Sequence, residues 1–180
     1  MNKNLRLSLL VILSLIIFII IYYNNFHGRN IVTTSSGKSK HDFVISGKAN
    51  IIDGDSLKIK GYEMRLLDLD APEYKQYCQD ANNDKYACGK ESMAYLKRLA
   101  KDATLDCYIS GRDYYNRLLA TCFKGKLNIN SKLVESGWAI RYNNESNYYK
   151  AEQKAKADKT GIWQGKFITP KQYRRLNPRK

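Results

Sequence analysis

The chain has 180 residues, which allows one well-buried domain with an additional segment and argues against two domains of full size. Its 31 Lys and Arg residues exceed its 17 Asp and Glu residues, so the formal net charge is +14. This charge favours a polyanionic partner: nucleic acid, anionic lipid or an acidic wall polymer. A solvated basic surface with no specific partner is the alternative.

The amino end predicts a membrane anchor. Lys3 and Arg6 precede an almost unbroken apolar run over residues 7–23, at the short end of the length that crosses a bilayer as a helix. The residues that follow lack the small-x-small cleavage site of a secretory signal. We therefore expect residues 1–23 to form an uncleaved signal anchor, the alternative being secretion after signal cleavage. Residues 24–42, rich in Asn, Thr, Ser, Gly and Lys, predict a flexible stalk.

The cysteines indicate on which side of the membrane the domain lies. They are even in number, which makes two disulfides feasible, and they are Cys78, Cys88, Cys107 and Cys122. Disulfides persist in oxidising compartments, so we expect an extracytoplasmic domain; four reduced thiols in a cytosolic protein are the alternative. A zinc site is disfavoured, because no two cysteines have ligand spacing and both histidines, His27 and His41, lie far upstream.

Residues 43–180 predict one α+β domain. Short β-like runs bounded by Gly, Asp and Asn predict five strands, at 43–46, 56–60, 63–67, 104–109 and 117–123. Apolar residues at helical spacing predict helices at 89–101, 128–136 and 146–159. This order indicates a mostly antiparallel barrel with packed helices. From residue 46 onward 26 basic residues stand against 16 acidic ones, so the charge excess belongs to the domain as well as to the anchor.

Two acidic motifs flank predicted strands. Asp53-Gly54-Asp55-Ser56 precedes one strand, and Asp70-Ala71-Pro72-Glu73 follows another, where the proline ends it. Four carboxylates at two strand ends predict a site for a hard cation, and calcium tolerates irregular geometry better than magnesium does. Taken singly, each motif is also ordinary turn chemistry.

Two arginines add phosphate chemistry to the acidic motifs. Arg65 lies between them in an otherwise apolar strand, and Arg117 ends the string Asp113-Tyr114-Tyr115-Asn116-Arg117. A guanidinium matches phosphate with paired hydrogen bonds. Phosphodiester hydrolysis needs an activated water, a counter-charge in the transition state and help for the leaving oxygen, and a metal, a carboxylate base and two arginines would supply these. Taken alone, Arg65 is more commonly an ion-paired or snorkelling strand residue.

Together, these strings resemble the staphylococcal nuclease (thermonuclease) family. They run from Ile52 to Ser56, from Arg65 to Glu73, from Asp113 to Arg117 and from Gly161 to Trp163, in that order. The resemblance implies a five-stranded OB-type β-barrel with packed helices. It also implies a calcium-dependent, sugar-nonspecific endonuclease that cleaves DNA and RNA and leaves 3′-phosphate ends.

The resemblance assigns a role to each residue of the acidic motifs. It implies that Asp55 and Asp70 bind calcium through their carboxylates and that Ala71 binds it through its backbone carbonyl. Glu73 matches the general base that accepts a proton from the attacking water.

The remaining implied site residues would contact substrate. Arg65 and Arg117 match the pair that holds the phosphate, and Tyr115 matches a tyrosine beside it, with packing on the surface as the alternative for that side chain. Tyr142 is a candidate for stacking on a base. Asn116 departs from the usual glycine, and we expect the turn to survive because Asn tolerates left-handed backbone.

The cysteines can also be assigned to pairs. Cys78 and Cys88 bracket a polar loop just after Glu73, and Cys107 and Cys122 fall on predicted neighbouring strands; similar pairs occur in secreted members of the family. The basic tail, residues 166–180, would track a phosphate backbone or form a solvated terminus.

Three functions of different classes remain. The first is the nuclease, acting on DNA and RNA as a monomer with no evident protein partner and tethered to the membrane by its amino-terminal helix. The second is a catalytically silent nucleic-acid-binding OB-type module, although such modules lose the arginine and carboxylate set that this chain keeps. The third uses the basic face only for anionic lipid or wall polymer, which explains the charge and none of the motifs.

Overall fold

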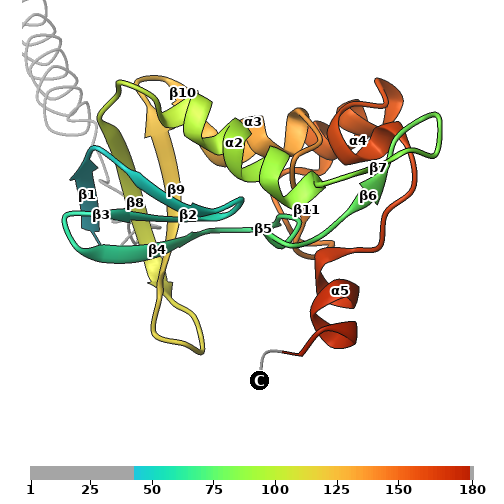
Figure 1. Ribbon diagram of the computed structural model, residues 1–180. Coiled ribbons are helices and arrows are strands. Elements are labelled where there is room, and N and C mark those ends of the chain that lie inside the picture. The colour runs from blue at the N-terminus through green and yellow to red at the C-terminus, as the bar shows by residue number, and fades with distance from the viewer. Residues whose placement is uncertain (1–42, 179–180) are drawn as a thin grey trace, which may run out of the picture. The chain divides into compact units, whose positions relative to one another are not determined.

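The structure, a computed structural model, describes residues 43–178 (Figure 1). The predicted membrane anchor, residues 1–23, and the predicted stalk, residues 24–42, lie outside the described residues. Within residues 43–178, no helix combines the length and the apolar character needed to cross a membrane.

The main sheet is mixed and curled (Figure 1). Its seven strands are β1 (Phe43–Gly47), β2 (Asn50–Asp53), β3 (Ser56–Ile59), β4 (Tyr62–Leu66), β8 (Leu105–Arg112), β9 (Leu118–Lys124) and β10 (Leu127–Asn128). They are ordered β1-β8-β9-β4-β3-β2, and β10 pairs with β9. Neighbouring strands are antiparallel, except that β4 and β9 run parallel.

The sheet confirms the α+β class and corrects the expected number of strands. All five predicted strands are present, and β2 and β10 are additional. β2 escaped prediction because Asp53-Gly54-Asp55-Ser56 closes a two-residue hairpin, with Asp53 opposite Ser56, and does not simply precede a strand. A curled mixed sheet with packed helices is an OB-like arrangement.

Helices and two short strand pairs complete the described part of the chain. The strand pairs are β5 (Leu69–Asp70) with β11 (Ile140–Arg141), and β6 (Cys78–Gln79) with β7 (Lys85–Tyr86). The helices are α2 (Cys88–Ala100), α3 (Ile129–Glu135), α4 (Tyr149–Ala157), the 3-10 helix η1 (Gly161–Gln164) and α5 (Pro170–Leu176). The three predicted helices are confirmed, whereas η1 and α5 were not expected.

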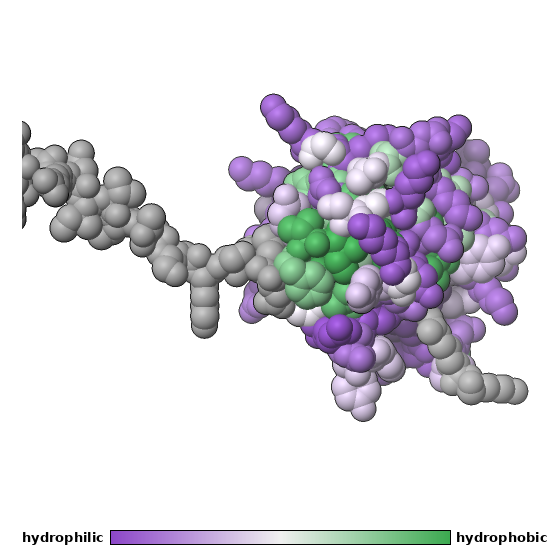
Figure 2. Space-filling view, turned by 90° about the vertical axis from the view of Figure 1, so that its left-hand side faces the viewer, coloured by the Kyte–Doolittle hydropathy of each residue, from purple (hydrophilic) through white to green (hydrophobic). Residues whose placement is uncertain are grey.

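The surface seen in Figure 2 is largely hydrophilic and carries one apolar patch. Large apolar side chains that remain exposed include Phe43 and Val44 in β1 and Ile52 in β2. A mainly polar surface agrees with the low mean hydropathy and the basic charge of the chain.

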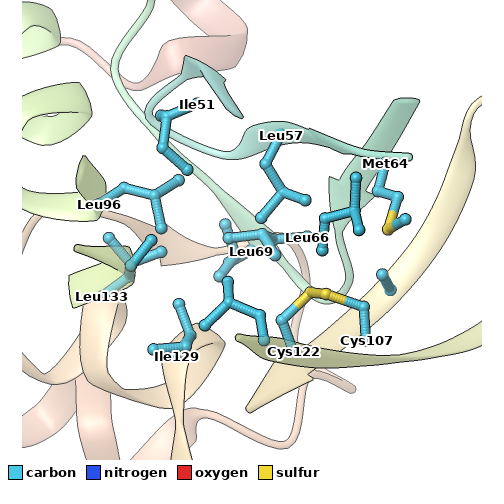
Figure 3. Close-up of a cluster of buried hydrophobic side chains, with 14 of the residues drawn as sticks. Ile51, Leu57, Met64, Leu66, Leu69, Leu96, Cys107, Cys122, Ile129 and Leu133 are labelled. Atoms are coloured by element: carbon cyan, nitrogen blue, oxygen red, sulfur yellow. A yellow bond between two sulfur atoms is a disulfide. The ribbon is translucent and has the colours of Figure 1, made fainter. Parts of the chain in front are cut away.

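The core lies between the sheet and helices α2 and α3 (Figure 3). Burial alternates along β8 and β9, because successive strand side chains point to opposite faces. Leu96 of α2 and Leu133 of α3 are fully buried beside Leu57, Leu66 and Leu69 from the strand region. Each such side chain contributes about 1.5–3 kcal/mol of burial free energy.

Both predicted disulfides are present. Cys107 in β8 and Cys122 in β9 stand directly opposite each other and are bonded, with their Cα atoms 4.0 Å apart. Cys78 in β6 is bonded to Cys88, the first residue of α2, and these Cα atoms lie 5.6 Å apart. The first bond lies in the core and the second restrains the loop that follows Glu73.

Candidate metal and phosphate site

The first carboxylate of the site stands on the hairpin between β2 and β3. Asp55 is 4% exposed; its Oδ1 accepts a hydrogen bond from the Ser56 hydroxyl at 2.8 Å, and its Oδ2 accepts one from the Ala71 backbone N–H at 3.3 Å. A Cβ on Gly54 would lie 2.4 Å from the Ser92 Oγ, so the tight packing that buries Asp55 requires a glycine there.

Arg65 joins this carboxylate to a second one. The sheet register places Arg65 of β4 opposite Ser56, and its guanidinium contacts both Asp55 Oδ1 at 3.1 Å and Asp55 Oδ2 at 2.9 Å. The same guanidinium donates to Asp70 Oδ1 at 2.6 Å. Asp70 is 3% exposed and lies in β5. Two buried carboxylates therefore share one arginine, which explains an arginine between the buried Met64 and Leu66 of β4.

Burial makes negative charge costly at this end of the sheet. It raises the pKa of Asp55, an effect that the Arg65 guanidinium opposes and the Asp70 carboxylate strengthens. Burial also raises the pKa of Asp53 to about 6, against the hydrogen bond that Gly54 donates to it. The cluster therefore favours a further positive charge beside it.

The donor set suits a hard cation with an open coordination sphere. Asp55 and Asp70 supply carboxylate oxygens, and Ala71, itself 3% exposed, follows directly in the chain. In residues 43–178, no group of three or more His, Cys, Asp or Glu side chains is arranged to enclose a metal ion. Calcium accepts carboxylate, carbonyl and water oxygens in irregular geometry, so two carboxylates and a carbonyl fit it when water and substrate complete the shell.

Glu73 stands on a braced turn. Its backbone N–H donates to Gln76 Oε1 at 3.2 Å, and its carbonyl accepts from the Gln76 backbone N–H at 2.7 Å. Gln76 is fully buried and also donates to the Ile168 carbonyl at 2.8 Å. Gly89, at the start of α2, packs so closely that a Cβ there would lie 1.8 Å from the Glu73 carbonyl oxygen. The turn is therefore held by α2 on one side and by the segment before α5 on the other.

Arg174 of α5 enters the site, which the sequence analysis missed. Its guanidinium contacts Asp70 Oδ1 and Oδ2 and Glu73 Oε1, each at 2.9 Å. Hydrogen bonds to Asp70 are the main cause that raises the pKa of this guanidinium. The sequence does contain a signal for helix α5. The string Thr169-Pro170-Lys171-Gln172 is a capping box with proline in the first turn, and it marks the start of a helix within the basic tail.

Arg117 directly precedes β9, the strand that pairs with the Arg65 strand β4, and its side chain is bound within its own turn. Its Nε donates to Asp113 Oδ2 at 2.8 Å, and its second ion-pair contact to that oxygen is 2.7 Å long. Asn116 has φ 64°, so the expected left-handed turn is present. Arg65 thus forms ion pairs with Asp55 and Asp70, whereas the Arg117 guanidinium forms its ion pair with Asp113.

The two candidate tyrosines are both exposed. Tyr115 is 75% exposed, and the Arg117 guanidinium carbon lies 5.6 Å from its ring centre. Tyr142 is 63% exposed, and its backbone N–H donates to the Asp68 carbonyl at 3.1 Å, just before β5. Both rings are therefore accessible to a ligand.

Comparison with known proteins finds that residues 63–165 match the family model described as staphylococcal nuclease homologue. The chain is 41% identical over 124 residues to the succinoglycan biosynthesis protein ExoI of Rhizobium meliloti, across 66% of this chain and 64% of ExoI. It is 33% identical over 134 residues to an uncharacterized endonuclease of Haemophilus influenzae, across 69% of this chain and 70% of that protein.

A fungal protein is also similar. The probable endonuclease lcl3 of Sclerotinia sclerotiorum is 26% identical over 167 residues, across 84% of this chain and 61% of the fungal protein. The matched part therefore spans less than two thirds of both ExoI and lcl3. Helix α5, with Arg174, lies beyond the residues that match the family model.

Proposed function

The chain belongs to the staphylococcal nuclease homologue family, and from this premise we propose that it is a calcium-dependent endonuclease that hydrolyses the phosphodiester bonds of DNA and RNA. The names of two relatives, an endonuclease and a probable endonuclease, support the reaction class. The observation that carries the proposal is the sharing of Arg65 by two buried carboxylates, Asp55 and Asp70, beside Glu73.

The proposed metal site uses the carboxylates of Asp55 and Asp70 and the backbone carbonyl of Ala71. A calcium ion held there would supply positive charge to the phosphate and lower the pKa of a bound water. Arg65 positions the two carboxylates, because its guanidinium contacts both. Ala71 needs no side-chain oxygen to bind the metal, since its backbone carbonyl is the proposed ligand.

Glu73 is the proposed general base. It accepts a proton from the attacking water as the water oxygen bonds to phosphorus, and the bond from phosphorus to the 5′-oxygen breaks. The 5′-oxygen takes a proton from a solvent water and leaves as a hydroxyl group, and the phosphate stays on the 3′-oxygen. The braced turn fixes the base, which lets it meet the water without a costly rearrangement.

Arg65 and Arg117 are the proposed phosphate ligands. Guanidinium groups stabilise charge that develops on the phosphate oxygens, and they do so best in paired contacts. Arg117 would exchange its contact with Asp113 for one with the phosphate. Tyr115 and Tyr142, both exposed, would contact the nucleotide on either side, and contacts to phosphate and aromatic stacking do not distinguish DNA from RNA.

The proposed organisation places the nuclease outside the cytoplasm. In this proposal residues 1–23 are the anchor that holds it to a membrane, residues 24–42 are the stalk, and residues 43–180 are a monomeric nuclease domain built on the curled OB-like sheet. The two disulfides support an oxidising compartment. Secretion after cleavage of the amino-terminal segment is the alternative.

The activity test uses the full chain in mild detergent, with plasmid DNA and with RNA, in calcium or in excess chelator. We expect both substrates to be cut in calcium and neither to be cut in chelator, with phosphate found at the 3′ ends. Cleavage in chelator would contradict the calcium requirement. Nucleic-acid binding without cleavage in calcium would instead support the silent OB-type module.

A further inference from the structure

Helix α5 brings a second arginine, Arg174, to the acidic cluster of Asp55 and Asp70, and this arginine contacts the carboxylate oxygens that a cation would bind. Arg174 contacts both carboxylate oxygens of Asp70, and Asp70 Oδ1 also accepts from Arg65. Both oxygens of this proposed ligand are therefore held by guanidinium groups. A cation that bonds to Asp70 would compete with these contacts for the same oxygens and would be repelled by the guanidinium charges.

Arg174 also holds the proposed base. One of its nitrogens contacts Asp70 Oδ1 and Glu73 Oε1, both at 2.9 Å, so the guanidinium bridges a metal ligand and the base. The Arg174 side chain is 35% exposed, whereas that of Asp70 is 4% exposed. The arginine can therefore move outward into water, while the carboxylate cannot.

The helix that carries Arg174 is short and attached through few groups. α5 has seven residues, and Thr169 and Gln172 cap its start through their own side chains. The Tyr173 hydroxyl donates to the Lys75 carbonyl at 3.1 Å, and the buried Gln76 holds the Ile168 carbonyl just before the helix. Leu176, the last helical residue, is 71% exposed. Together with the buried Pro170, Arg174 is thus a main contact between the helix and the rest of the domain.

We propose that Arg174 is a built-in competitor of the metal: it neutralises Asp70 and Glu73 in the cation-free protein, and a cation must displace it to bind. Helix α5 then sets the calcium concentration at which the site fills. This inference rests on the calcium site of the proposed function. It extends that function, because the competing residue lies beyond the part of the chain that matches the family model.

The test measures calcium affinity by titration calorimetry on the full chain without nucleic acid. Arg174→Gln should bind calcium about tenfold more tightly than the wild type, because the charge-assisted contacts of Arg174 no longer have to be broken. Arg175→Gln is the matched control, since Arg175 is the next residue of the same helix and forms no ion pair with residues 43–178. It should keep the wild-type affinity.

A second variant loosens the helix and keeps the charge. Tyr173→Phe removes the hydrogen bond to the Lys75 carbonyl and should tighten calcium binding by a smaller factor, so it tests the inference even if Arg174→Gln fails to fold. In the wild type, calcium should also speed hydrogen exchange of the α5 backbone amides, because the helix loses its contact with Asp70.

The outcomes separate this inference from the proposed function. Unchanged or weaker calcium binding in both Arg174→Gln and Tyr173→Phe, beside normal binding by the wild type, would overturn the competition and leave the calcium nuclease intact. Absence of calcium binding in all variants would overturn the metal site itself, and the competition with it. Tighter binding in both variants, with Arg175→Gln unchanged, supports the inference.

Discussion

At the residue scale, Glu73 is the position where chemistry and structure are easiest to separate. Its backbone groups are fixed by Gln76, and its side chain projects to Arg174, so a change of the side chain leaves the turn in place. Glu73→Gln should therefore lower turnover by about a hundredfold or more, as expected when a general base is removed, while nucleic-acid affinity and unfolding temperature change little.

The prediction for Glu73→Gln is checked on one preparation by its cleavage rate, by filter binding of nucleic acid and by thermal unfolding. Gln76→Ala is a useful contrast, because it removes the side chain that braces the turn and should lower both turnover and stability. Undiminished turnover in Glu73→Gln would remove Glu73 from the mechanism.

Glu152 is a residue whose role is stability. It is 5% exposed and accepts hydrogen bonds from the Arg141 backbone and guanidinium and from Lys156. Glu152→Gln leaves Arg141 without its counter-charge, and we expect a loss of about 3 kcal/mol in the free energy of unfolding at neutral pH. Glu145→Gln, an exposed change in the preceding loop, should have little effect. Urea unfolding of the three proteins measures the difference.

The contribution of Glu152 depends on pH. Burial alone would raise the pKa of Glu152, but hydrogen bonds from Lys156 and Arg141 outweigh it and hold the pKa below its usual 4.5. A carboxyl with a lowered folded-state pKa stabilises the protein above its unfolded-state pKa and loses that effect as pH falls through the folded-state value. The difference in the free energy of unfolding between the wild type and Glu152→Gln should thus persist down to about pH 4.5 and shrink below that pH.

Part of the candidate site was predictable from the set of motifs, although each motif taken singly was not enough. Asp55, Arg65 and Asp70 come together as the spacing of their motifs indicates, because a hairpin and two adjoining strands are local structure. Arg174 lies 104 residues from Asp70, and no local pattern pairs residues at that distance. The partner of Arg117 was also missed, since either a phosphate or Asp113 satisfies an arginine at that position.

At the scale of elements, the start of α2 controls the turn that carries Glu73. A Cβ on Gly89 would lie 1.8 Å from the Glu73 carbonyl oxygen and 2.9 Å from the Tyr74 carbonyl carbon, and these are backbone atoms that cannot rotate away. Gly89→Ala should therefore displace the turn, at a cost of about 1–3 kcal/mol in stability and with a marked loss of cleavage rate.

The matched change for Gly89→Ala is Lys97→Ala, which places alanine at an exposed position of the same helix. Its cleavage rate and unfolding temperature should stay close to those of the wild type. A Gly89→Ala protein with normal turnover would show that the Glu73 turn tolerates the displacement.

The two disulfides should contribute differently. The bond from Cys107 to Cys122 closes 15 residues within the core strands, so replacing both by alanine should cost about 3 kcal/mol on the chain-entropy model. The bond from Cys78 to Cys88 joins β6 to the start of α2, beside the Glu73 turn, so its loss should lower turnover as well as stability.

Thermal unfolding and cleavage rate of the two double alanine variants distinguish the bonds. A core-bond variant that loses stability and keeps its turnover at low temperature would agree with the assignment. Equal losses of turnover in both variants at a temperature where both are folded would contradict it.

Elements with strong local patterns were the predictable ones. The five predicted strands and three predicted helices have alternating or helical apolar spacing, and each is present. The pairs of two residues, β5 with β11 and β6 with β7, have too few residues for any period to show. They form because neighbouring segments hold them together, which is tertiary information.

At the scale of the whole molecule, the net charge of +14 should govern nucleic-acid binding. Each phosphate that the protein neutralises releases a counterion, so affinity falls with salt. For the Glu73→Gln protein, which holds substrate without cutting it, we expect affinity to drop about a hundredfold between roughly 50 and 200 mM salt if about four phosphates are contacted.

Fluorescence anisotropy with labelled DNA and RNA of equal length measures this dependence. The two slopes of log affinity against log salt should be similar, because backbone phosphate is common to both polymers. Binding that is insensitive to salt would contradict phosphate contact as the main source of affinity.

The parallel pairing of β4 with β9 also affects the order in which the molecule assembles. It sets Arg65 beside Leu119 and so brings the strand that carries Arg65 next to the strand that begins just after Arg117. Helix α2 and strand β8 lie between them in the chain. Pairings between distant segments close late in folding, because chain entropy must be lost before they form. The segments that carry Arg65 and Arg117 therefore come together at a late step, so the proposed phosphate site is completed only late in folding.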